Sequence, residues 1–113
     1  MLILKSSISR EELRALAGNT FGYMIKGVAD ISRGVMALDA DLHSDLERLL
    51  IVDGSNQSDL WGFNLYPDET GDAFIEYDSL INIRSWQGNP SRDILDPGVR
   101  GTLKEVIEKF IKD

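Results

Sequence analysis

Leu60-Trp-Gly-Phe-Asn-Leu-Tyr-Pro67, together with the run from Phe74 to Arg84, decides the fold of this chain. In both runs the odd-numbered positions are mostly apolar and the even-numbered positions mostly small or polar. Such period-two alternation is typical of β-strands with one buried face. The two runs are therefore predicted to form an antiparallel hairpin, and the segment between them supplies turn-favouring residues, namely Pro67, Asp68, Gly71 and Asp72.

A turn centred near residue 70 predicts the register of this hairpin. It pairs Leu65 with Ile75, which gathers the apolar side chains on one face, whereas a slip by one residue would mix the two faces. Helices are expected to cover the apolar face, which carries Trp61, Phe63, Tyr77 and Ile81. The opposite face is expected to be solvated and to carry Asn64, Glu76, Asp78, Asn82 and Arg84.

Three segments have helical patterns. Ser9-Arg-Glu-Glu12 reads as a capping box, and it predicts a helix over residues 10–17. Leucines recur at helical spacing from Leu42, which predicts a helix over residues 42–51 capped by Asp39 or Asp41, although residues 46–52 stay open between helix and buried strand. Asp96-Pro97 opens a last helix, whose apolar stripe is predicted to pack on the sheet and consists of Leu103, Val106, Ile107, Phe110 and Ile111.

A second hairpin is predicted between Phe21–Ile31 and Val35–Leu38. Its turn contains Gly34, and two registers remain open, with Ile31 opposite either Val35 or Met36. The element order αββαββα predicts an α+β fold, with an antiparallel sheet of four to five strands from two hairpins covered by about three helices. The 113 residues are expected to form one domain, 1–113.

Composition and charge limit the classes of function that this chain can have. The chain has no cysteine, which excludes disulfides and thiolate chemistry, and its net charge is −7 without any basic run. An acidic surface repels phosphate backbones, so nucleic acid is not an expected partner. No apolar run approaches the length of a membrane span, and the start of the chain is too short for a signal peptide, so no membrane partner and a cytoplasmic location are expected.

Several segments resemble a family of small single-domain prokaryotic proteins of unknown function. The likeness extends from the first predicted helix to the last, and it rests on Leu60-Trp-Gly-Phe-Asn-Leu-Tyr-Pro67, Ser79-Leu-Ile-Asn-Ile-Arg84, Gln87-Gly-Asn89, Leu42-His-Ser-Asp45 and Asp53-Gly-Ser55. The resemblance implies a compact single domain. It brings no catalytic residue and no cofactor.

Amide and guanidinium groups gather at the end of the second run and in the loop after it. Such donors suit a carboxylate or a phosphate, and an exposed indole can stack on a ligand or anchor a partner. The alternative is that Arg84 pairs with Glu76 or Asp78 and that the loop only turns the chain. The predicted ligand-binding residues are Asn82, Arg84, Trp86, Gln87, Asn89 and Arg92.

Acidic residues and the single histidine form a second cluster. Asp39, Asp41, His43 and Asp45 alternate along the chain, and they would gather a cation only on a strand, whereas the helical pattern favours capping. No metal site is therefore predicted.

Three functional hypotheses follow. The leading one is a binding module for a small anion or carboxylate. The second is a homodimer formed through a sheet edge or Trp86. The third is a small hydrolase or isomerase that uses His43 with Asp45 or Glu76.

Overall fold

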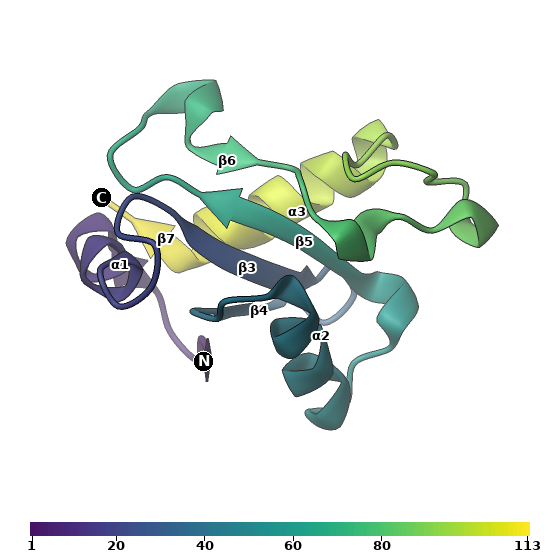
Figure 1. Ribbon diagram of the computed structural model, residues 1–113, viewed down its shortest axis with the longest axis horizontal. Coiled ribbons are helices and arrows are strands. Elements are labelled where there is room, and N and C mark those ends of the chain that lie inside the picture. The colour runs from purple at the N-terminus through teal and green to yellow at the C-terminus, as the bar shows by residue number, and fades with distance from the viewer.

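The computed structural model describes residues 1–113 and has an α+β architecture (Figure 1). A five-stranded antiparallel sheet has the strand order β1-β4-β3-β5-β6, and β2 and β7 form a separate parallel pair. The strands are β1 (Leu2–Ile3), β2 (Ile8–Ser9), β3 (Ile25–Asp30), β4 (Val35–Leu38), β5 (Leu60–Leu65), β6 (Ile75–Glu76) and β7 (Ile111–Lys112). The helices are α1 (Arg10–Ala17), α2 (His43–Val52) and α3 (Pro97–Phe110).

Both faces of the sheet are covered. In Figure 1, α2 lies in front of the sheet and α3 lies behind it. Leu13 of α1 and Leu103 of α3 belong to the larger buried cluster, which also holds Phe63. Leu46 and Leu50 of α2 belong to a second cluster with Leu60. Strand β5 is therefore buried along all six residues. The predicted solvated face is wrong for Asn64, Asn82 and Arg84, which are buried, whereas Glu76 is exposed.

The helices follow the local signals in the sequence. Ser9 and Glu12 form the predicted capping box at the start of α1. The Asp96 side chain accepts hydrogen bonds from the amides of Gly98 and Val99 at the start of α3. Residues 43–52 are helical, so the segment 46–52 belongs to a helix and not to a buried strand. No side chain caps the start of α2, so the predicted cap by Asp39 or Asp41 is wrong.

The hairpin registers are confirmed in one case and corrected in the other. Leu65 lies opposite Ile75, as the alternation predicts. In the other hairpin Asp30 lies opposite Val35, which neither predicted register gives. The cause is the Asp30 carboxylate, whose Oδ1 accepts from the amides of Ser32 and Arg33 at 2.8 and 2.9 Å and so forms a longer turn.

The predicted strand over residues 74–84 is mostly absent. Pairing with β5 ends at Glu76, and two 3₁₀ turns follow, η3 (Leu80–Asn82) and η4 (Ser85–Gln87). Ser79 starts η3 because its hydroxyl accepts from the amide of Ile81 and its carbonyl from the amide of Asn82. No helix in the structure has both the length and the apolar character needed to cross a bilayer.

Candidate functional site

The outer edge of β5 is completed by a side chain where β6 stops. Asn82 is fully buried, and its Oδ1 accepts from the amide of Gly62 at 2.8 Å while its Nδ2 donates to the carbonyl of Gly62 at 3.0 Å. The asparagine amide thus replaces one residue of a neighbouring strand. A Cβ on Gly62 would lie 2.6 Å from Cβ of Ser79, so only glycine permits this approach.

Arg84 completes the same edge at its beginning. Its side chain is 1% exposed, its guanidinium donates to the carbonyls of Leu60 and Ile81, and it stacks on Trp61 with Cζ 4.5 Å from the ring centroid. The nearest carboxylate is that of Glu47 in α2, at 3.8 Å. Burial raises the pKa of Glu47 and lowers that of Arg84. The guanidinium is therefore not on a solvated face, and it pairs with neither Glu76 nor Asp78.

Asn89 fixes the segment that follows. Its Nδ2 donates to the carbonyls of Asn82, Ser91 and Asp93, and its Oδ1 accepts from the amide of Leu95. A backbone bridge also joins Asn89 to Arg84. These buried groups hold residues 91–93 in place. Of the remaining predicted site residues, Trp86 and Gln87 are exposed in η4, and Arg92 projects from the segment that Asn89 holds.

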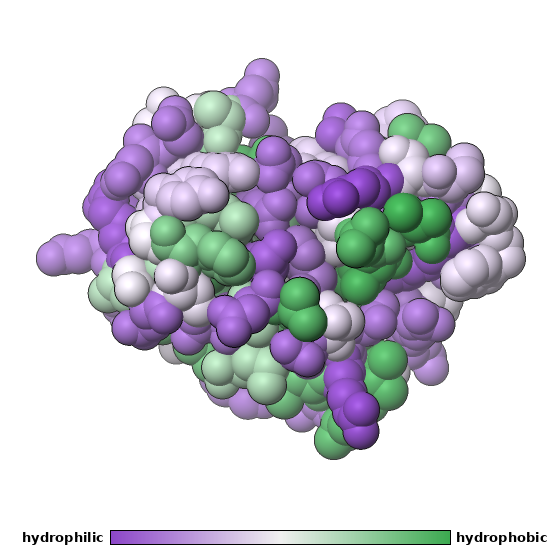
Figure 2. Space-filling model, viewed as in Figure 1, coloured by the Kyte–Doolittle hydropathy of each residue, from purple (hydrophilic) through white to green (hydrophobic).

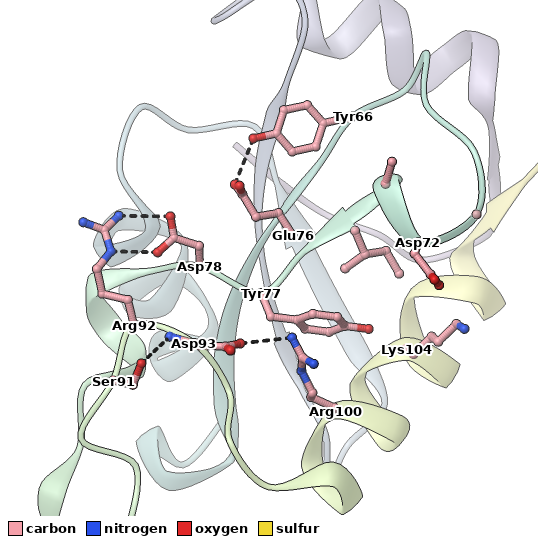
Figure 3. Close-up of a pocket in the computed structure, with 13 residues that line it drawn as sticks. Tyr66, Asp72, Glu76, Tyr77, Asp78, Ser91, Arg92, Asp93, Arg100 and Lys104 are labelled. Carbon is pink, nitrogen blue, oxygen red and sulfur yellow. Dashed lines mark hydrogen bonds and ion pairs between the residues drawn. The ribbon is translucent and has the colours of Figure 1, made fainter.

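A cleft of about 920 Å³ lies along the free edge of β6 (Figure 3). Its walls come from residues 75–78, from residues 91–93 and from the exposed side of α3. The charged residues that line it are Asp72, Glu76, Asp78, Arg92, Asp93, Arg100 and Lys104. Arg92 is the one predicted site residue in this lining.

Ion pairs occupy one end and the centre of the cleft. Arg92 Nε and Nη2 donate to the two carboxylate oxygens of Asp78 at 2.7 and 3.3 Å. Arg100 Nη2 donates to Asp93 at 3.0 Å, and its Cζ lies 4.3 Å from the ring centroid of Tyr77. Arg100 Nε is buried without a hydrogen-bond partner. The centre of the cleft therefore has an aromatic wall, and the guanidinium of Arg100 lies against it.

The other end of the cleft carries two weakly engaged charges. Lys104 Nζ has only a 3.8 Å contact with Glu108, and Asp72 forms no salt bridge. Figure 3 shows both at the end of the cleft opposite Arg92, with Tyr77 and Arg100 between. A ligand group of either charge can reach an oppositely charged side chain there.

A tyrosine borders the upper side of the cleft in Figure 3. The Tyr66 hydroxyl donates to Glu76 Oε1 at 2.8 Å. Burial and this carboxylate raise the pKa of Tyr66 to about 12. Tyr66 is therefore a neutral hydrogen-bonding group at physiological pH.

His43 lies elsewhere, in the first turn of α2. Its Nε2 is 2.8 Å from the carbonyl of Phe63, so this nitrogen carries the proton and donates it. Burial lowers the pKa of His43, and no carboxylate accepts from its ring. The structure contains no group of three or more acidic or histidine side chains arranged to hold a metal ion.

The predicted ligand-binding residues do not include Arg100 and Lys104, the cleft residues on α3. Arg100 and Lys104 are four residues apart, so they lie on the same side of the helix, next to its apolar stripe. This spacing is the signal in the sequence that places the two basic side chains together on the surface of the helix.

Comparisons with known proteins give a family but no described relative. The sequence matches the family described as "Protein of unknown function (DUF5674)" over residues 2–110. Neither the curated proteins nor the solved structures contain a match to this chain.

Proposed function

Since the chain belongs to the DUF5674 family, whose description assigns no activity, we propose a function from the cleft itself: a binding module for small ligands that carry a carboxylate. The observation that carries the proposal is the pair of weakly engaged charges, Lys104 and Asp72, beside the partly exposed guanidinium of Arg100. Lys104 and Arg100 supply the donors for the carboxylate.

The charge balance of the lining favours a ligand that also carries a positive group. The cleft is lined by three basic and four acidic side chains. A simple anion would meet net repulsion, whereas an ammonium group on the same ligand can pair with Asp72. Free amino acids and short peptides combine both groups.

The free edge of β6 fits the same ligand class. Residues 75–78 line the cleft along an edge that has no further strand beside it. Unpaired backbone groups on a sheet edge bind extended peptides through main-chain hydrogen bonds. The ring of Tyr77 adds apolar surface for the carbon atoms between the two charges.

A titration monitored by NMR tests the proposal. Glycylglycine is added to ¹⁵N-labelled protein, with glycinamide, which lacks the carboxylate, and acetate, which lacks the ammonium, as comparison ligands. We expect saturable shifts of amides in residues 75–78, 91–93 and 98–104 with glycylglycine, and weaker binding of both comparison ligands.

A substitution of Lys104 tests whether this side chain contacts the carboxylate of the ligand. Lys104→Met is expected to raise the dissociation constant for glycylglycine about fivefold, because a half-exposed charge contributes roughly 1 kcal/mol. Lys112→Met is the matched control, since Lys112 lies outside the cleft. Linear shifts without saturation, or equal affinity of Lys104→Met and wild type, would contradict the proposal.

A further inference from the structure

The segment 79–91 has an uncharged surface on an acidic protein. Its only ionisable side chain is Arg84, which is buried, while the whole chain has a net charge of −7. At its ends, Asp78 and Arg92 neutralise one another in an ion pair. We call this segment the neutral loop.

The neutral loop also exposes large apolar side chains. Leu80 is 66% exposed, Ile83 43% and Trp86 75%. Figure 2 shows hydrophobic atoms gathered at the right of the view, over the green turn near residue 80 of Figure 1. Exposed tryptophan beside other apolar side chains is the composition found at the centre of protein–protein interfaces.

The neutral loop is held in one conformation by the rest of the fold. The backbone bridge between Arg84 and Asn89 closes the turn that carries Trp86. Gln87 Nε2 donates to the carbonyl of Ser58 at 3.1 Å, and Arg84 binds carbonyls of β5 and η3. A surface that is already ordered loses little backbone freedom when it binds a partner.

We propose that the neutral loop binds the same loop of a second copy of this chain, in a two-fold symmetric dimer. Two molecules that each carry a charge of −7 repel one another wherever acidic side chains meet. The neutral loop allows them to approach without bringing exposed like charges into contact. A two-fold axis then places the same apolar side chains of both copies together.

The size of the surface sets the strength of this dimer. A tryptophan buries at most about 250 Å², so one tryptophan with two aliphatic side chains gives less than the roughly 800 Å² per partner of a standard interface. The dimer is therefore weak and forms at high protein concentration.

Sedimentation analysis over a concentration series up to about 1 mM tests the proposal, since a dissociation constant in the millimolar range is detected there. Wild type is expected to shift from monomer to dimer, with a blue shift of the emission of Trp86. Trp86→Ser and Ser85→Asp, which places a charge on the exposed loop, are both expected to weaken the dimer at least tenfold. Val52→Ser is the matched control, because Val52 is 80% exposed on α2.

The salt dependence distinguishes a dimer formed through the neutral loop from one held together by ion pairs. Raising the NaCl concentration is expected to strengthen the dimer, since salt screens the repulsion between the two acidic chains. A wild type that stays monomeric over the whole series would overturn the proposal. A dimer that persists in both loop variants, or that salt weakens, would also overturn it.

Discussion

Replacing Asn82 by alanine tests whether the amide of this residue completes the sheet. The substitution removes three hydrogen bonds, two with the backbone of Gly62 and one with the carbonyl of Arg92. Alanine offers no polar atom in return. The amide and the carbonyl of Gly62 are then left without the side-chain partner on their outer side, whereas the carbonyl of Arg92 still accepts from the amide of Ser79 at 3.1 Å.

The expected loss of stability follows from the burial of these groups. A buried donor or acceptor without a partner costs about 1–3 kcal/mol. Because only the two groups of Gly62 lose a partner and water can enter the space left by the amide, we expect a total loss of about 3–4 kcal/mol. Domains of this size are stable by only about 5–15 kcal/mol, so the change is large.

Urea unfolding at neutral pH, followed by circular dichroism, measures this loss. Asn82→Ala is expected to lower the midpoint by about 2 M with an unchanged slope. Asn56→Ala is the control, since Asn56 is exposed and its side chain caps nothing, and it is expected to stay within about 0.5 kcal/mol of wild type. A loss below about 1 kcal/mol for Asn82→Ala would refute the role assigned to this amide.

Three further substitutions probe other parts of the fold. Gly62→Ala is expected to lose at least about 2 kcal/mol in the same urea assay, because its Cβ would lie 2.6 Å from that of Ser79; an unchanged midpoint would contradict the close approach. Ser9→Ala is expected to cost about 1 kcal/mol and to lower the melting temperature by about 4 °C, whereas Ser7→Ala should leave it unchanged; equal melting temperatures of the two variants would refute the capping box. The stability of wild type is expected to fall as pH decreases below 6.5, because the unfolded state protonates His43 before the folded state does. His43→Gln should reduce this slope, and identical slopes would show that another group causes it.

The sequence allowed the local features to be predicted, since each depends on residues close together in the chain. The capping residues Ser9 and Asp96 determined where α1 and α3 begin, and alternation determined the pairing of Leu65 with Ile75. The burial of Asn82 was not predictable in the same way. A polar residue in an alternating run looks the same whether it faces water or completes the edge of a strand, and only the strand's partner decides.

The candidate site shows the same limit. The apolar stripe of α3 identified the side of this helix that packs on the sheet, but no local pattern indicated what lies beside its exposed side. Arg100 and Lys104 become cleft residues because β6 and residues 91–93 lie next to them, a juxtaposition of segments distant in sequence.

The asparagine that stands beside Gly62 also limits how far this sheet can grow. A complete strand in that position would present a fresh row of amides and carbonyls to other molecules, and such rows nucleate fibrils. A single amide satisfies Gly62 and presents no second row, so the half of β5 beyond β6 offers no backbone edge to which a strand of another chain could be added. Asn82 thereby protects this edge of the sheet from the successive addition of strands from other molecules.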